Sequence, residues 1–92
     1  MNDNPGPFVY ILECSDKTLY TGWTVNMQKR LKEHNEGRAG ARYTRGRRPL
    51  KLVYKELCST RSDALKRERE IKKLSRTRKL LLIKKASEAG LI

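Results

Sequence analysis

The stretch Phe8–Val25, which reads FVYILECSDKTLYTGWTV, decides the fold. From Phe8 to Cys14 the side chains point alternately to two faces, and this alternation predicts a β-strand. Residues 15–17, Ser-Asp-Lys, supply turn chemistry. Residues 19–25 are rich in β-branched and aromatic side chains, which predicts a second strand. Together the two segments predict an antiparallel hairpin.

Two tyrosines of this hairpin, Tyr10 and Tyr20, lie ten residues apart. Any register that pairs residues whose numbers add to an even value, such as Cys14 with Thr18, places both tyrosines and Gly22 on one face. Gly22 then lies across from Tyr10 or diagonal to it. We expect this arrangement to leave a gap beside the two phenols that a phosphate can enter. The alternative is that both tyrosines are ordinary strand aromatics.

A helix is predicted to follow the hairpin. Asn26 is a favourable N-cap residue, and Gly37 is predicted to close the helix as the C′ residue. Arg30 and His34 are four residues apart and therefore neighbours on one side of the helix. Because the apolar Leu31 borders them, we expect the pair at the edge of the core, over the tyrosine face. The alternative is a solvated Arg-His pair.

Residues 37–49 form a strongly basic segment with five arginines, three glycines and no acidic residue. We expect a loop whose guanidinium groups contact a phosphate backbone, with Tyr43 available to stack on a base. Lys29, in the preceding helix, adds a further cation. The residues predicted to bind nucleic acid are therefore Lys29, Arg38, Arg42, Tyr43, Arg45, Arg47 and Arg48. A purely solubilising run of charge is the alternative.

Alternation returns at Leu50–Cys58, which predicts a third strand. Thr60 and Asp63 form a capping arrangement for a helix running to about residue 74, and Ser75 can cap another helix from residue 76 to about residue 86. The sequence predicts an α/β fold of the α+β type, in which about three helices flank a three-stranded antiparallel sheet. We expect one domain over residues 1–92, with its core at about residues 7–86.

Glu68 interrupts the apolar stripe of the first of these two helices. At about 100° per residue, its neighbours on that stripe are Ala64, Leu65 and Ile71. Glu70 points roughly opposite and is expected to be solvated. Burying a lone carboxylate is costly, so Glu68 should have a cation partner, either a metal ion or a nearby Arg or Lys. A structural salt bridge with the flanking Lys72 is the alternative to a metal.

The formal net charge of +12, from 22 Lys and Arg against 10 Asp and Glu, indicates a polyanionic partner, because neutralising phosphates releases counterions. The longest apolar run, residues 80–83, is far too short to span a bilayer, so no membrane is expected. The N-terminal residues lack the apolar region of a secretory signal, which favours the cytoplasm. Cys14 and Cys58 form no zinc-binding pattern with the single histidine and are expected to be reduced strand residues.

The chain contains an ordered set of functional side chains, Tyr10, Tyr20-Thr21-Gly22, Arg30, His34 and Glu68. This set resembles the GIY-YIG nuclease family, and residues 8 to about 82 are similar to the family's small stand-alone bacterial members. Phe8 departs from the pattern, because it stands where the family has its first glycine, and this ring can narrow the site. The resemblance implies that the catalytic residues are Tyr10, Tyr20, Arg30, His34 and Glu68.

The resemblance also implies a role for each of these residues. Glu68 is the single metal-binding carboxylate, for which Mg²⁺ is the expected ion and Mn²⁺ a substitute. The tyrosines orient or deprotonate the attacking water. Arg30 clamps the scissile phosphate, and His34 hydrogen-bonds a tyrosine or the phosphate. Ionising an unperturbed phenol, with a pKa near 10, costs about 4 kcal/mol at pH 7, so nearby positive charge is needed if a tyrosine is the base.

We therefore expect a metal-dependent endonuclease that hydrolyses phosphodiester bonds of nucleic acid, with DNA favoured over RNA. No targeting domain is recognisable, so a partner protein can supply specificity. Two other hypotheses stay open, a nucleic-acid-binding module without activity and a ribosome-associated or protein-interaction module. The sequence also leaves open which tyrosine is the base, whether the substrate is branched, damaged or single-stranded, and the oligomeric state.

Overall fold

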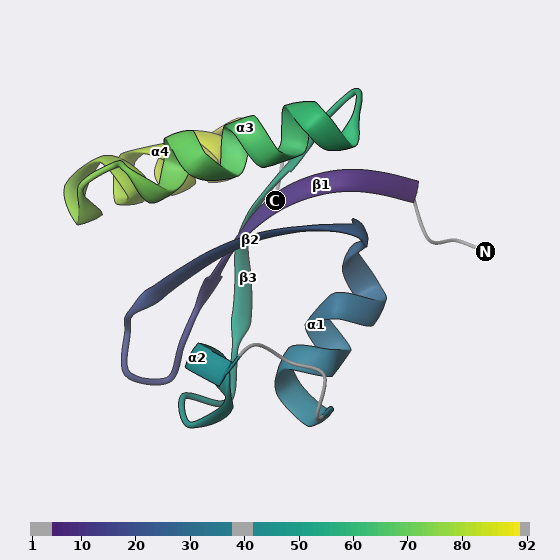
Figure 1. Cartoon of the computed structure of the whole chain (residues 1–92). Coiled ribbons are helices and arrows are strands. Elements are labelled where there is room, and N and C mark those ends of the chain that lie inside the picture. The colour runs from purple at the N-terminus through teal and green to yellow at the C-terminus, as the bar shows by residue number, and fades with distance from the viewer. Residues whose placement is uncertain (1–4, 38–41, 91–92) are drawn as a thin grey trace.

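A three-stranded antiparallel sheet forms the centre of the molecule (Figure 1). The computed structural model describes residues 5–37 and 42–90. Within these ranges the strands are β1 (Pro5–Glu13), β2 (Leu19–Asn26) and β3 (Lys51–Leu57), in the order β2-β1-β3. β1 and β2 form the predicted hairpin, and β3 pairs with the other side of β1. The predicted sheet is confirmed, with β2 and β3 as its edge strands.

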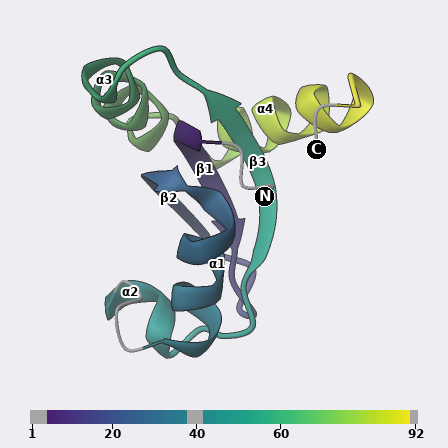
Figure 2. The same cartoon turned by 90° about the vertical axis from the view of Figure 1, so that its right-hand side faces the viewer.

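Four helices in the described ranges cover the sheet. They are α1 (Met27–Glu36), α2 (Arg42–Arg45), α3 (Arg61–Lys72) and α4 (Arg76–Glu88). Figure 1 and Figure 2 show α3 and α4 together on one side of the sheet, with α1 and α2 on the other. This is the predicted α+β arrangement, with the short α2 added. Among the residues that the structure describes, no helix has the length and apolar character needed to cross a membrane.

The helix α2 corrects the prediction of a continuous loop over residues 37–49. Neither Gly nor Pro occurs between Arg42 and Arg45, so the local sequence does not prevent a helical turn. The side chain of Thr44 is fully buried and lies within hydrogen-bond distance of His34. The helical turn of α2 therefore forms together with a contact between Thr44 and His34 of α1, and the sequence around Thr44 does not indicate this contact.

The predicted helix caps are formed by local side chains. In α1, α3 and α4 the N-cap side chain accepts a hydrogen bond from the backbone N–H three residues later, and these residues are Asn26, Thr60 and Ser75. Gly37 ends α1 with an extended backbone, at φ −91°, so it is the C-cap itself and not a left-handed C′ residue. The helix starts therefore follow from short-range chemistry that the sequence displays.

Each face of β1 contributes to a separate hydrophobic core, as the alternation predicts. The core beneath α1 contains Phe8, Tyr10, Leu12, Cys14, Met27 and Leu50. The core beneath α3 and α4 contains Val9, Ile11, Tyr54, Ala64, Ile71 and Ala86. Because β1 is the central strand, its side chains are buried on both sides and fix the sheet relative to both helical layers.

The contact between Tyr10 and Gly22 corrects the expected gap beside the phenols. The two residues are direct partners in the hairpin register, as predicted. A Cβ atom on Gly22 would lie 2.6 Å from the Tyr10 hydroxyl oxygen, so the phenol itself fills the space that a side chain would occupy. Tyr10 is only 1% exposed. The absent side chain at position 22 therefore accommodates the Tyr10 ring and not a phosphate.

We predict that Gly22→Ala lowers the free energy of unfolding by about 1–3 kcal/mol, the usual cost of overpacking a filled core. The Tyr10 ring is enclosed and cannot move aside without losing its own contacts. Gly46→Ala is the matched control, because nothing lies within 4 Å of a Cβ atom built there. Urea unfolding of both variants measures the difference. Equal stabilities of the two variants would contradict the proposed contact.

Candidate active site

The buried Tyr10 hydroxyl begins a chain of polar groups that connects the sheet to α1 and α2. Its oxygen lies 2.9 Å from His34 Nε2, and His34 Nδ1 lies 2.9 Å from Thr44 Oγ1. Tyr10, His34 and Thr44 are each at most 1% exposed. Both ring nitrogens of the histidine therefore have hydrogen-bond partners inside the protein, which satisfies a polar side chain that would otherwise be costly to bury.

The environment of this chain determines its protonation. Burial, followed by the positive charge of Arg30, lowers the pKa of His34 to about 4. Burial also raises the pKa of Tyr10 to about 12, although a hydrogen bond from Arg30 acts in the opposite direction. At pH 7 the imidazole and the phenol are therefore both neutral. A neutral imidazole has one donor and one acceptor nitrogen, so the two hydroxyls flanking His34 play opposite roles.

Tyr20 lies beside this chain and joins it to an aromatic cluster. Its ring centroid is 6.5 Å from that of Tyr10, 5.3 Å from that of His34 and 5.9 Å from that of Tyr43. The hydrophobic core beneath α1 only partly buries Tyr20. Tyr20 is therefore the more accessible of the two predicted catalytic phenols, and Tyr43 covers it from α2.

Arg30 reaches the Tyr10 hydroxyl from α1. Its guanidinium hydrogen-bonds the Tyr10 side chain and forms an ion pair with Glu33, with 3.0 Å between Arg30 Nη1 and Glu33 Oε1. The side chain is 25% exposed. Arg30 is therefore held in place by a neighbour on its own helix and by the buried phenol, while part of its surface stays accessible.

Glu68 approaches from α3, which lies on the other face of the sheet. Its side chain is only 16% exposed, and the fully buried Ala64 and Ile71 flank it on the helix. The apolar stripe is narrower than predicted, because Leu65 is 38% exposed. Glu70 is mainly exposed, with 65% of its side-chain surface accessible, as predicted. Glu68 is thus a carboxylate largely enclosed by apolar neighbours.

The cation beside Glu68 is Lys72, the partner expected if Glu68 forms a structural salt bridge and not a metal site. Lys72 Nζ lies 3.4 Å from Glu68 Oε2, and the lysine side chain is 54% exposed. Glu68 nevertheless influences the phenol site, since its negative charge adds to burial and to Tyr20 in raising the pKa of Tyr10. Electrostatic coupling therefore links α3 to the residues contributed by the sheet and α1.

An ion pair next to Glu68 holds α3 against the sheet. Arg67 Nε donates to Glu56 Oε1 on β3 at 3.0 Å, and the Tyr54 hydroxyl donates to the same oxygen at 2.6 Å. Arg67 also pairs with Glu70 at 3.0 Å. The Arg67–Glu56 bond crosses from the sheet to the residue that precedes Glu68, so it anchors α3 to β3 beside this carboxylate.

Tyr10 connects all five predicted catalytic residues. It contacts Tyr20 and His34 through its ring, hydrogen-bonds Arg30 and responds to the charge of Glu68. The helices that carry Arg30 and Glu68 lie on opposite faces of the sheet, and α1 and α3 both contact β2. Tyr10, Tyr20, His34 and Arg30 are therefore in contact on the α1 side of the sheet, and Glu68, on α3, acts on them through its charge.

A metal ion at this site would have one carboxylate from the protein. Within residues 5–37 and 42–90, no group of three or more His, Cys, Asp or Glu side chains is arranged to hold a metal. A single enclosed carboxylate suits Mg²⁺, which commonly keeps several waters and is completed by substrate phosphates. Cys14 and Cys58 are both free, and they lie just beyond the ends of β1 and β3.

The arginines of the basic segment divide into two groups. Arg48 donates to the carbonyl oxygens of His34 and Gly37, at 2.7 and 2.6 Å, so it caps the C-terminus of α1. Arg47 bonds Asp16 at 3.0 Å, with its Cζ 4.0 Å from the centre of the Tyr43 ring. Arg42 and Arg45 are exposed. Arg38 lies outside the described residues.

These contacts change the interpretation of three predicted nucleic-acid-binding residues. Arg48 has a structural role, because its guanidinium is used at the end of α1. Tyr43 is 41% exposed, but its ring already stacks near Tyr20 and lies beneath Arg47. Arg42 and Arg45 are the two described arginines of this segment that are exposed.

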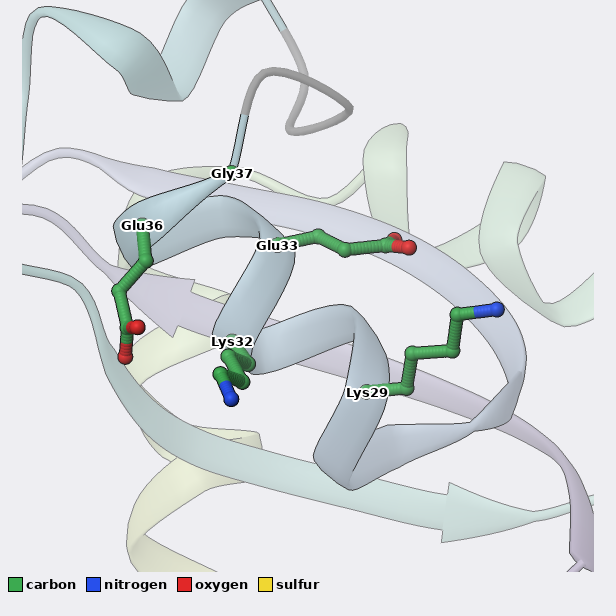
Figure 3. Close-up of a pocket in the computed structure, with 5 residues that line it drawn as sticks. All are labelled: Lys29, Lys32, Glu33, Glu36 and Gly37. Atoms are coloured by element: carbon green, nitrogen blue, oxygen red, sulfur yellow. The ribbon is translucent and has the colours of Figure 1, made fainter.

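Lys29 lies on the outer surface of α1, beside a pocket of about 350 Å³ (Figure 3). Two lysines and two glutamates line this pocket, together with Gly37. Figure 3 shows Lys29 and Glu33 extending in the same direction from the helix. The charges of the lysines and glutamates cancel, so this surface attracts a polyanion less strongly than its two lysines alone would.

Sequence reasoning missed Thr44 as the partner that completes the Tyr10-His34 chain. Nothing local distinguishes this threonine within a basic segment, since its importance comes from a contact ten residues away with His34. Phe8, which was expected to narrow the site, belongs to the same buried cluster as Tyr10. It packs beneath α1, with Lys55 Nζ of β3 at 5.8 Å from its centre, and it lines a pocket on the side of β3.

Comparison with known proteins places this geometry in a family. Residues 6–81 match the GIY-YIG catalytic domain. A UPF0213 protein from Syntrophus aciditrophicus is 64% identical over 81 residues, which cover 88% of this chain and 93% of that protein. Another from Desulfotalea psychrophila is 59% identical over 88 residues, which cover 96% of this chain and 79% of that protein.

Two solved structures share the fold. The solution NMR structure of a UPF0213 protein from Bacillus halodurans has a TM-score of 0.55 and 42% identity, covering 85% of this chain and 82% of that chain. The solution NMR structure of a protein from E. faecalis has a TM-score of 0.62 and 38% identity, covering 92% of this chain and 90% of that chain. With the family match over most of its length, the chain belongs to the GIY-YIG family.

Proposed function

We propose that this protein is a divalent-metal-dependent endonuclease that hydrolyses phosphodiester bonds, with DNA as its preferred substrate. The observation that carries the proposal is the set of contacts that Tyr10 makes with Tyr20, His34 and Arg30, together with the charge of Glu68 acting on the same phenol. Membership of a nuclease family and a net charge of +12 support it. Binding alone does not require a carboxylate, which repels phosphate, at the centre of a basic protein.

Tyr20 is the residue that orients or deprotonates the attacking water. Ionising Tyr10 at pH 7, with its pKa raised to about 12, would cost about 7 kcal/mol, against about 4 kcal/mol for an ordinary phenol. Tyr10 is also fully enclosed, so a water molecule has little access to its oxygen. The role of Tyr10 is to position His34 and Arg30, while the half-buried Tyr20 is the phenol that a water molecule can reach.

Arg30 and Glu68 supply the charge that phosphodiester hydrolysis requires. The planar guanidinium of Arg30 can bind two nonbridging oxygens of the scissile phosphate, and its bond to Tyr10 fixes its direction. Glu68 would hold the metal ion, which when bound neutralises charge on the leaving oxygen. Lys72 lies close enough to keep the carboxylate paired until a metal takes its place.

A nucleic-acid-binding module without activity is the second candidate, because one observation favours it. The ion pair with Lys72 satisfies Glu68 without any metal. Plasmid nicking with Mg²⁺, Mn²⁺ or EDTA, measured beside filter binding at two salt concentrations, separates the two candidates. Binding without nicking in any metal would select the second candidate and overturn the first.

We predict that Glu68→Gln abolishes metal-dependent nicking and leaves the fold intact. The amide keeps the size of the side chain but loses the negative charge that a divalent ion requires. Glu70→Gln is the matched control, because it makes the same change two residues away on an exposed side chain. Nicking and thermal unfolding are measured for both variants. Undiminished nicking by Glu68→Gln would refute the metal assignment.

We predict that Tyr20→Phe slows cleavage by on the order of 10²-fold, because it removes the hydroxyl that handles the proton of the water. Tyr43→Phe is the control, since it removes a hydroxyl from the adjacent stacked ring. Single-turnover cleavage rates compare the two. A loss below about threefold in Tyr20→Phe, at unchanged stability, would identify Tyr20 as an ordinary strand aromatic.

We predict that His34 stays neutral well below pH 6.5 and titrates near pH 4. The folded protein then binds fewer protons than the unfolded chain, so stability is full above pH 6.5 and falls by up to about 3 kcal/mol as the pH approaches 4. The chain has a single histidine, so one set of imidazole NMR signals reports its pKa. Titration near pH 6.5 would contradict a buried, doubly bonded ring.

A further inference from the structure

A pocket of about 350 Å³ lies along the outer edge of β2, next to the candidate active site. The residues that line it are Trp23, Thr24, Val25, Arg30 and Arg61. Three of them come from β2, one from α1 and one from the first position of α3. Its volume is at the lower end of the range of small-ligand sites, which suits an occupant of the size of one nucleotide.

The charges around this pocket favour an anion. Two guanidinium groups line it, and its described lining contains no carboxylate. The nearest acidic groups along the chain are Glu33, which is paired with Arg30, and Asp63, in the first turn of α3. The pocket on α1 has two lysines and two glutamates, so its charges cancel. Of these two surfaces, the β2 edge is the one lined by cationic side chains without carboxylates, and it gains the charge of Arg61 in addition to the paired Arg30.

Arg30 belongs both to this pocket and to the candidate active site. The same side chain hydrogen-bonds Tyr10 in the candidate active site and lines this pocket. A phosphate bound by Arg30 therefore has the pocket as its immediate neighbour. β2 is an edge strand, and the backbone of such a strand can donate hydrogen bonds to phosphate oxygens.

Trp23 gives the pocket an aromatic wall. Its indole is only partly buried, packing against the core beneath α3 and α4 while also lining the pocket. Val25 beside it is 43% exposed. A base that leaves its stack can pack on such an apolar surface while its phosphate meets the guanidinium groups. Aromatic and cationic groups side by side are the combination that single-stranded nucleic acid needs.

We infer that this pocket binds the nucleotide next to the scissile phosphate, with its base against Trp23 and its phosphate on Arg61. The inference rests on the proposed function, since it extends the substrate path from the same site. It predicts a preference for a strand whose bases are unpaired at this position, because a base inside a duplex cannot reach the indole. Arg61 is thereby a binding residue outside the set of five catalytic side chains.

The test uses Trp23 as its probe, because it is the single tryptophan of the chain. A short single-stranded DNA is titrated into the protein in EDTA, which prevents metal-dependent cleavage. Indole emission is followed together with the anisotropy of a labelled oligonucleotide. We expect a saturable change in Trp23 emission that parallels binding, and a weaker response to the same sequence as a blunt duplex.

Arg61→Gln is compared with Arg76→Gln, a matched control that removes the same charge from another exposed arginine, at the first position of α4. Arg61→Gln should weaken binding of the single strand by about tenfold. It should also reduce the slope of log K against log salt by about 0.7, as expected for one lost phosphate contact. Arg76→Gln should leave both the slope and the Trp23 response close to those of the parent protein.

Equal losses in the two variants, or binding without any change in Trp23 emission, would overturn the inference. Plasmid nicking by the same samples in Mg²⁺ keeps the two proposals apart. Nicking without a Trp23 response would overturn the proposed nucleotide pocket and support the proposed nuclease activity. A Trp23 response that depends on Arg61, without nicking in any metal, would support the nucleotide pocket and overturn the proposed hydrolytic activity.

Discussion

The close approach of the Tyr10 phenol to the bare backbone of Gly22 is the constraint on which the site depends. With any side chain at position 22, the phenol would have to leave its place on the hairpin. It would then lose the contact with His34 Nε2, and the histidine would be left with a buried nitrogen that lacks a partner. The Tyr10 phenol also supports the two covering elements. It holds His34, which contacts Thr44 of α2, and it hydrogen-bonds the guanidinium of Arg30 on α1. One glycine thus couples the hairpin to both elements that cover its tyrosine face.

Local patterns predicted the parts of the structure that local chemistry determines. The period of two in β1, the register of the hairpin and the N-caps all follow from residues close together in sequence. The enclosed position of Glu68 follows from helical spacing, because Ala64 and Ile71 are fully buried on either side of it. The Tyr10-Gly22 packing, α2 and the cap of Arg48 depend on pairs of segments that meet only in the folded chain. No spacing within a single segment carries that information.

The basic segment shows why counting arginines overestimates the surface free to bind a polyanion. Arg47 and Arg48 use their guanidinium groups on Asp16 and on the last carbonyls of α1. These bonds hold the segment against the hairpin and place Tyr43 beside Tyr20. Two of the positive charges in this segment therefore build one wall of the candidate site. The net charge of +12 is therefore a poor guide to where nucleic acid lies on the surface.

The residues of the candidate site are distributed over both helical layers and the sheet. Arg30 and Glu68 belong to helices on opposite faces, so the sheet separates them everywhere except beyond its edge. β2 is the edge strand that both α1 and α3 contact. An edge site is open to a long polymer, which cannot enter a closed cavity. Glu68 is the one carboxylate of the predicted set, so a metal ion held there would need the substrate's own phosphate to complete its coordination. In that case metal binding and substrate binding would be coupled.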